Sequence, residues 1–218
     1  MSNFDLVIFD CDGVLVDSEA LASQVWCDFL SEYNVHLTPE NLNQEYAGMT
    51  DGALAEAMRQ KYDVRFDGNV PQQIEHRCDV IFDTQLTAIE GVTAVIKKVA
   101  GLKCICTNSS QRRLLRSLRI TDLITLFDPD HLFSARMVSK PKPAPDLHLF
   151  AADKMGTAPA NCLIIEDTVT GVTAGVAAGM KVYGYTGASH FGDAQADKLK
   201  TAGATEVFRN MSDILDVI

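Results

Sequence analysis

Long apolar runs are absent from this chain of 218 residues, and no stretch approaches the length that a helix needs to cross a bilayer. The first residues lack the basic start and apolar centre that are typical of a secretory signal peptide. We therefore expect a cytoplasmic protein with no membrane partner. The apolar fraction of 47% is that of an ordinary globular protein, large enough for one core and a smaller inserted domain.

Basic residues are too few for a nucleic-acid binder. Nineteen lysines and arginines stand against 29 acidic residues, which gives a formal net charge of -10. Proteins that bind nucleic acids carry basic patches that neutralise phosphates, so we expect no nucleic-acid partner. The deficit is concentrated in residues 18–88, where the only basic residues are Arg59, Lys61, Arg65 and Arg77. This shift in composition indicates either a separate module or a solvated helical surface.

Several common site motifs are also missing. The six cysteines form no C-x-x-C pair and several lie in apolar runs, so we expect neither disulfides nor a structural zinc. The chain has no G-x-x-x-x-G-K loop, no G-x-G-x-x-G turn and no H-E-x-x-H pair, which excludes the common nucleotide-binding and zinc-protease classes. A calcium loop starting at Asp10 is excluded because Val14 occupies the third ligand position.

A pair of aspartates at the end of an apolar segment is the most informative feature that is present. Leu6 to Phe9 are apolar at every position, which favours a strand of a parallel sheet that is covered on both faces. Asp10 and Asp12 follow directly, where such strands place their ligands. Two carboxylates this close indicate a metal site, an acid/base pair or both. A turn rich in aspartate is the structural alternative.

The remaining pattern predicts an α/β protein with a helical insertion. Apolar residues recur at helical spacing from Leu21 to Tyr33 and from Leu54 to Tyr62, and a further helix is expected at about residues 71–86. From Glu90 onward, helices alternate with short apolar strands, which implies a mostly parallel, Rossmann-like sheet. The strands are expected at 103–106, 162–165 and 181–185, and the helices at 93–99, 111–118, 145–155 and 169–178. We expect a core of residues 1–17 and 89–218 and an inserted helical-bundle domain of residues 18–88.

Three further polar segments complement the aspartate pair. Thr107, Asn108, Ser109 and Ser110 follow one strand just before a helix, where hydroxyl groups and free N–H groups can hold an anion or simply cap the helix. A second acidic pair follows another strand, and a proline-rich loop between them carries two lysines. Together these segments supply carboxylates for a divalent cation, donors for phosphate and a lysine for residual negative charge. The acidic pair is Glu166 and Asp167, and the lysines are Lys140 and Lys142.

These segments resemble the four motifs of the haloacid dehalogenase superfamily, most of whose members are phosphatases. Residues 10–19 are similar to the first motif and Thr107-Asn108 to the second. The string Lys142-Pro143-Ala144-Pro145-Asp146 is similar to the third motif, and residues 166–168 with Gly171 and residues 178–180 are similar to the fourth. The helical insertion resembles the small α-helical cap of the family. The motifs occur in the family's order over nearly the whole chain.

The resemblance implies an aspartyl-phosphate mechanism. Asp10 would attack phosphorus, and Asp12 would protonate the leaving alcohol and then help to deprotonate water. Mg²⁺ would be held by the Asp10 side chain, the Asp12 carbonyl and Asp167, with Glu166 as a further ligand or as a partner of a bound water. Thr107, Asn108 and Lys142 would bind the phosphoryl group. The residues assigned to the cap side of the substrate site are Gly48, Met49 and Thr50.

Departures from the motifs separate the rival activities of the superfamily. A true dehalogenase lacks a carboxylate at the position of Asp12, and a phosphonatase needs a cap lysine near Gly48, which this chain lacks. A mutase similar to β-phosphoglucomutase carries an arginine where Asp51 stands and a histidine near Ala22. We therefore rank a monomeric phosphatase of a small phosphorylated sugar or sugar acid above the mutase. A non-catalytic metal-binding or partner-binding protein on the same fold is the remaining alternative.

Overall fold

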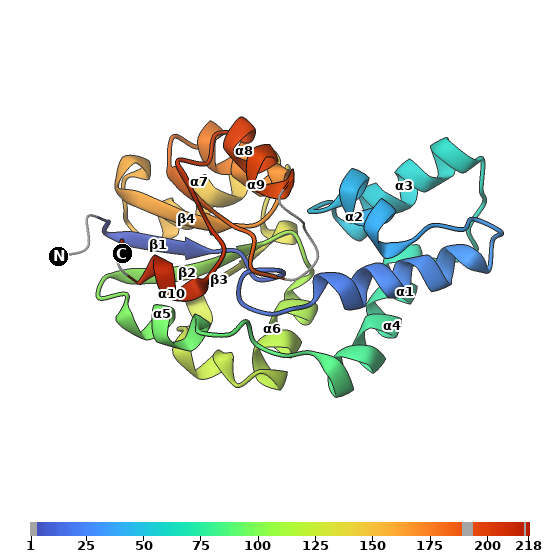
Figure 1. The fold of residues 1–218 in the computed structure, drawn as a ribbon, viewed down its shortest axis with the longest axis horizontal. Helices are drawn as coiled ribbons and strands as arrows, with labels where there is room; N and C mark the ends of the chain where they lie inside the picture. Colours follow the sequence, from blue (N-terminus) through green and yellow to red (C-terminus); the bar gives the residue numbers. More distant parts are fainter. Residues whose placement is uncertain (1–3, 189–193, 216) are drawn as a thin grey trace.

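The computed structural model describes residues 4–188, 194–215 and 217–218. Figure 1 shows two parts, a sheet flanked by helices and a separate group of helices beyond one end of the sheet. In the described residues no helix combines the length and the apolar character that spanning a membrane requires. The expected α/β class with a mostly parallel sheet is confirmed.

In the described residues the sheet consists of six parallel strands in the order β3-β2-β1-β4-β5-β6. Strand β1 lies between β2 and β4, with Ile8 opposite Cys104 on one side and Ile164 on the other. All four residues of β1 are buried, as the continuous apolar run predicts for a central strand. The strands are β1 (Leu6–Phe9), β2 (Leu102–Thr107), β3 (Leu132–Ser134), β4 (Cys162–Glu166), β5 (Lys181–Tyr185) and β6 (Glu206–Phe208).

Helices cover both faces of the sheet (Figure 1). Because side chains alternate along a strand, Leu6 and Ile8 pack on one face while Val7 and Phe9 pack on the other. The first face is covered by α7 (Asp146–Lys154), α8 (Val169–Ala177) and α9 (Ala194–Ala202). The second is covered by α5 (Val92–Lys98), α6 (Gln111–Ile120) and α10 (Met211–Ile214). Short 3-10 turns occupy Leu123–Leu126, Pro129–His131, Ala135–Met137 and Pro159–Asn161.

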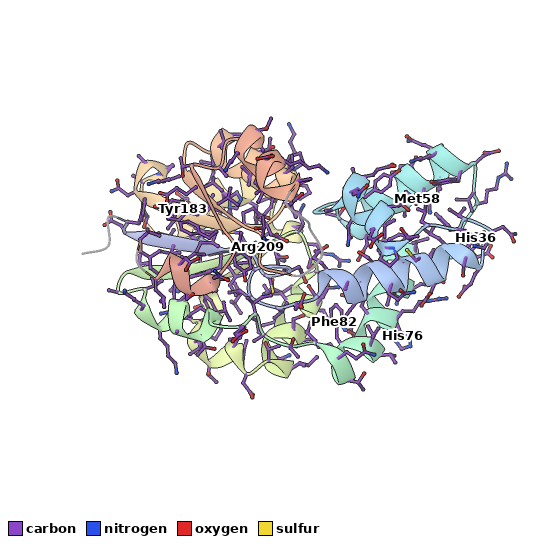
Figure 2. The ribbon with its side chains drawn as sticks, viewed as in Figure 1. His36, Met58, His76, Phe82, Tyr183 and Arg209 are labelled. Atoms are coloured by element: carbon purple, nitrogen blue, oxygen red, sulfur yellow. The ribbon has the colours of Figure 1, made fainter. Side chains whose placement is uncertain are left out.

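The helical insertion contains α1 (Glu19–Ser31), α2 (Pro39–Tyr46), α3 (Asp51–Tyr62) and α4 (Val70–Gln85). Figure 2 shows Met58 of α3 within this group and Phe82 of α4 at the end of the group that adjoins the core, both far from Tyr183 of the sheet. Both are at most 1% exposed, and their apolar cluster continues without a break into the cluster on the α5 and α6 face. We call these four helices the cap and the rest of the molecule the core; the boundaries at residues 18 and 88 stay a prediction.

Both chain connections between core and cap lie side by side. Val16, on the way into the cap, forms an antiparallel bridge with Ala88, on the way out. The Asp17 N–H donates to the Thr87 carbonyl at 2.9 Å, and the Ile89 N–H donates to the Leu15 carbonyl at 3.0 Å. The cap is therefore attached at a two-stranded hinge.

Several elements differ from the sequence expectation. The predicted strand at 181–185 has the expected bounds, and the other predicted elements from residue 90 onward agree to within about two residues. Four elements of the core, β3, β6, α9 and α10, were not predicted, and neither was the cap helix α2. Helix α2 has only one fully buried apolar residue, Leu42, so it shows no helical apolar stripe. Strands β3 and β6 have three residues each, too few for a recognisable alternation.

Candidate active site

The ends of the three central strands bring the predicted polar residues together. Asp10 follows β1, Thr107 ends β2 and Glu166 ends β4. Because these strands are parallel neighbours, their carboxyl ends meet at one edge of the sheet, on the side where the cap lies (Figure 1). One pocket there is lined by Asp10, Asp12, Thr107, Asn108, Lys142 and Glu166.

Lys142 lies between two carboxylates at the centre of this pocket. Its Nζ donates to Asp10 Oδ1 at 2.7 Å and to Glu166 Oε2 at 2.8 Å. All three side chains are almost fully buried. Burial alone would lower the pKa of Lys142, but the charges of Asp10 and Glu166 outweigh it and raise that pKa above its ordinary value. The ammonium therefore carries a permanent positive charge beside Asp10.

Asp10, Glu166 and Asp167 form a buried acidic cluster. One ligand oxygen from each lies within 4.8 Å of the others. Burial, followed by the charge of Glu166, raises the pKa of Asp10 and of Asp167 well above the ordinary value. A divalent cation among these carboxylates would lower both pKa values again and hold the groups ionised.

The Asp167 carboxylate supplies the test of whether these residues fit a metal ion. Both of its oxygens are buried, and neither has a hydrogen-bond partner in the described part of the chain. Buried carboxylate oxygens are costly when they are unpaired, and Mg²⁺ is a cation that prefers oxygen ligands. Gly13, with φ of +79°, lies so close that a Cβ there would fall 2.0 Å from Asp167 Oδ2. The donor set therefore fits a hard divalent cation, and the neighbouring backbone leaves room for the carboxylate.

Glu166 is held in position from the other side. Its Oε1 accepts hydrogen bonds from the Thr168 hydroxyl at 2.8 Å and from the Thr168 N–H at 3.2 Å. Gly171 makes room for this carboxylate, because a Cβ there would lie 2.0 Å from Glu166 Oε2. One carboxylate oxygen is thus fixed by Thr168 while the other binds Lys142. Glu166 orients the lysine as well as contributing to the acidic cluster.

Asp12 is surrounded by hydroxyl groups rather than by a cation. Ser18 Oγ donates to Asp12 Oδ1 at 2.7 Å, and Ser109 Oγ donates to Asp12 Oδ2 at 2.7 Å. Thr107 Oγ1 makes a longer contact of 3.3 Å with the same oxygen. The two aspartates of the first motif therefore have different environments, which is what an acid/base residue beside a nucleophile requires.

Asn108 connects three segments of the molecule. Its Nδ2 donates to the Gly48 carbonyl of the cap at 2.9 Å and to the Lys142 carbonyl at 3.0 Å. Its Oδ1 accepts from the Lys142 N–H at 3.1 Å. The side chain thus fixes the backbone of the lysine loop and touches the cap, which leaves the main chain of Asn108 as the group that can face a phosphoryl oxygen.

The cap supplies the wall of the pocket opposite the strand ends. Of the predicted cap residues, Gly48 and Met49 line the pocket, whereas Thr50 accepts from the Ala53 N–H and caps α3. The cavity measures about 90 Å³.

An ion pair that was not predicted joins the cap to the core at the wall of the pocket. Arg113 of α6 donates through an Nη atom to Asp51 Oδ2 at 3.0 Å, and Trp26 Nε1 donates to Asp51 Oδ1 at 3.0 Å. The Arg113 side chain is 10% exposed. Burial by itself lowers the pKa of Arg113, but the charge of Asp51 and those of further neighbouring acidic groups together outweigh it and raise that pKa above its ordinary value, so the guanidinium stays charged. Both oxygens of Asp51 are therefore engaged.

Glu19, at the start of α1, adds a carboxyl group to the cap wall. Burial, followed by the charge of Asp12, raises its pKa to about 7. The sequence places Glu19 in the first motif without giving it a role. Ser18 and Ser109 likewise fell inside recognised segments, whereas Arg113 gave no signal because its partner Asp51 is 62 positions away.

Comparison with known proteins agrees with this geometry. Residues 4–179 match the family of haloacid dehalogenase-like hydrolases. The chain is similar to 6-phosphogluconate phosphatase of Escherichia coli, with 30% identity over 87% of this chain and 86% of that protein. It is also similar to hexitol phosphatase A of Escherichia coli, with 28% identity over 80% of each chain. A crystal structure of a haloacid dehalogenase-like protein from Agrobacterium tumefaciens has a TM-score of 0.85 and 36% identity, over 98% of this chain and 97% of that one.

The family match covers most of the chain and contains the first three motifs and the start of the fourth. This protein therefore belongs to the haloacid dehalogenase-like hydrolases. The resemblance inferred from the motifs and the expectation of a hydrolase are both confirmed.

Proposed function

We propose that this hydrolase is a Mg²⁺-dependent phosphatase that cleaves a small sugar or sugar-acid phosphate through an aspartyl-phosphate on Asp10. The observation that carries the proposal is the buried Lys142, which pairs with Asp10 and Glu166 beside the unpartnered Asp167 carboxylate. A nucleophile, a cation and an acidic cluster at one strand edge suit phosphoryl transfer. The names of the two Escherichia coli relatives support the substrate class.

In the proposed first step, an Asp10 carboxylate oxygen attacks phosphorus, and the bond between phosphorus and the leaving oxygen breaks. Asp12 gives its proton to that oxygen, so that an alcohol leaves. In the second step Asp12 takes a proton from water, the water oxygen bonds to phosphorus, and the bond from phosphorus to Asp10 breaks. The hydroxyl groups of Ser18 and Ser109 hold Asp12 in position for both proton transfers.

The side chains of Asp10, Glu166 and Asp167, with the main-chain carbonyl of Asp12, would hold Mg²⁺. When bound, the ion neutralises negative charge on the carboxylates and on the phosphoryl group. Lys142 adds a second positive charge beside Asp10, and Thr107 and the Asn108 N–H would donate to phosphoryl oxygens. These groups bind and orient the phosphate, whereas the cap surrounds the leaving group.

The mutase alternative receives no support from the cap. Asp51, which stands where the resemblance places a mutase arginine, is itself paired with Arg113 of the core. Ala22, near the expected mutase histidine, lines the pocket without a titratable group. The phosphatase therefore remains the better proposal.

The test is a screen of phosphomonoesters, with p-nitrophenyl phosphate as a generic member, in Mg²⁺ and in EDTA. We expect phosphate release in Mg²⁺ only, and a loss of at least about four orders of magnitude in kcat/KM for Asp10→Asn. The matched control is Asp130→Asn, an exposed aspartate outside the pocket, which should keep full activity. Equal hydrolysis by Asp10→Asn, or conversion of glucose 1-phosphate to glucose 6-phosphate without phosphate release, would contradict the proposal.

A further inference from the structure

We propose that the cap wall of this pocket selects an uncharged polyhydroxylated leaving group, a sugar or sugar alcohol, over one that carries a carboxylate. The inference rests on the proposed phosphatase function and narrows its substrate class. It follows from one arrangement: each cation among the described lining residues is already ion-paired, and Glu19 adds a carboxyl group to the wall.

The pocket lining contains two cations in the described part of the chain, Lys142 and Arg113. Lys142 is shared between Asp10 and Glu166 at 2.7 and 2.8 Å, on the phosphate side. Arg113 lies on the cap side, where its Nη atom is 3.0 Å from Asp51 Oδ2. Trp26 holds the other Asp51 oxygen, so the Asp51 carboxylate is fixed toward the arginine. A substrate carboxylate would have to compete with Asp51 for Arg113.

The cap side of the pocket carries one positive and two potentially negative groups, since Glu19 joins Asp51 against Arg113. A carboxylate that leaves water to enter this wall loses hydration and meets like charge, without an unpaired cation to compensate it. The same carboxylate would also be repelled by the negative charge of the phosphoryl group and of the nearby acidic cluster. The wall therefore disfavours an anionic leaving group.

Hydroxyl groups suit the same wall, because each can donate and accept a hydrogen bond. Glu19 can accept from a hydroxyl when ionised and can also donate to one when protonated, and burial brings its pKa to about 7. Asn43 accepts from Ser23 through Oδ1, which leaves the N–H donors of its amide for a hydroxyl oxygen. Both residues line the pocket on the cap side. The cap wall thus offers hydrogen-bond donors and acceptors to the hydroxyl groups of a polyol, but it offers no unpaired positive charge to a carboxylate.

The experiment compares pairs of substrates that differ only at the end remote from phosphate. Glucitol 6-phosphate is paired with 6-phosphogluconate, and glycerol 3-phosphate with 3-phosphoglycerate, so that the charge rule is tested at two chain lengths. Phosphate release is measured with saturating Mg²⁺, with p-nitrophenyl phosphate as the generic ester. We expect kcat/KM for the alcohol member to exceed that of the acid member at least tenfold in the better-hydrolysed pair, mainly through KM.

Two variants assign the discrimination to the cap wall. Glu19→Gln removes the carboxylate charge at constant shape, and Asp51→Asn releases Arg113 for a substrate carboxylate. Each is expected to reduce the alcohol-to-acid ratio at least fivefold, through a lower KM for the acid. Glu40→Gln is the matched control, because Glu40 is an exposed cap glutamate outside the pocket lining. This control should leave the ratio unchanged.

The outcomes separate this inference from the proposed function. A ratio near one or in favour of the acid, with p-nitrophenyl phosphate hydrolysed, overturns the selectivity and leaves the phosphatase intact. Hydrolysis of the generic ester with no turnover of either pair overturns the polyol class in the same way. Failure of all five esters overturns both proposals. An unchanged ratio in both Glu19→Gln and Asp51→Asn overturns the assignment to the cap wall.

Discussion

The strand ends of the core and the cap wall hold their polar residues in different ways. At the strand ends, Lys142, Asp10 and Glu166 are almost completely buried and bind one another directly. In the cap wall, Glu19 and Asp51 are only partly buried, and Asp51 depends on Arg113 from the core for its partner. Under the proposed function, the chemistry would be built into the sheet, whereas selectivity would depend on how the cap meets it. Changes at the strand ends should therefore have large effects, and changes between cap and core small ones.

The largest effect on stability is expected for Lys142→Met. Removal of the ammonium leaves Asp10 and Glu166 as uncompensated charges in the interior, which should cost about 3–5 kcal/mol of unfolding free energy in EDTA. Urea denaturation followed by circular dichroism measures this loss. Lys140→Met, an exposed lysine in the same loop, should change stability by less than about 0.5 kcal/mol. A similar small change for both variants would contradict the role of Lys142.

Mg²⁺ should stabilise the parent protein and should do so most strongly at alkaline pH. Ligand at 100 times its Kd raises the unfolding free energy by about 2.7 kcal/mol. Asp10 and Asp167 have raised pKa values in the folded state, so between the unfolded pKa and the folded pKa the folded metal-free protein binds extra protons. Its stability in EDTA therefore falls as pH rises, and the gain from Mg²⁺ grows.

Thermal denaturation at pH 6 and pH 8, with Mg²⁺ and with EDTA, checks this expectation. The Asp167→Asn variant should lose most of the shift in Tm caused by Mg²⁺. A shift that is larger at pH 6 than at pH 8, or that persists in Asp167→Asn, would show that the ion binds elsewhere.

His148 is a further buried titratable group of the core, and its effect on stability can be compared with that of the partly exposed groups of the cap. It is fully buried on α7, and neither ring nitrogen has a hydrogen-bond partner in the described residues. Burial, followed by the charge of Lys142, lowers its pKa well below the ordinary value. Below about pH 6.5 the unfolded chain binds a proton that the folded protein does not. The unfolding free energy therefore decreases as the pH is lowered, by up to about 1.4 kcal/mol per pH unit.

The variant His148→Phe should lose this part of the pH dependence. The readout is the slope of unfolding free energy against pH between 6.5 and 5 in saturating Mg²⁺, compared with the parent. Any constant change from altered packing does not affect that slope. The control is His36→Phe, at an exposed position on the cap, which should keep the parental slope. Equal slopes for the parent and His148→Phe would be inconsistent with a neutral buried imidazole.

The smallest effect is expected between cap and core. Arg116 of α6 contacts Asp83 of α4 at 2.5 Å and Asp79 at 3.3 Å, but the Arg116 and Asp83 side chains are 33% and 50% exposed. Arg116→Gln should therefore cost less than about 1 kcal/mol, and added salt should reduce the difference from the parent. Urea denaturation at 0.05 M and 0.5 M NaCl measures both. A loss above about 2 kcal/mol would mean that the cap is held as firmly as the strand ends.

The strand ends were predictable from the sequence because their signal is local. An apolar run followed by Asp10, Thr107 or Glu166 marks both a strand and the point where it ends, and parallel order brings these points together. The cap wall was not predictable in the same way. Arg113 lies three positions into an amphipathic helix, where an arginine is usually solvated, and its pairing with Asp51 depends on how two separate helices meet.

The hinge also has a consequence for how such a protein can diversify. Because the main chain leaves the core at Val16 and returns beside it at Ala88, the insertion is joined to the core through the main chain at two neighbouring residues. A different helical module joined at the same two neighbouring residues would leave the register of β1 with β2 and β4 unchanged. Exchange of the insert between relatives is therefore a route to a new substrate that preserves the hydrolytic machinery, and chimeras cut at this bridge are the natural way to engineer one.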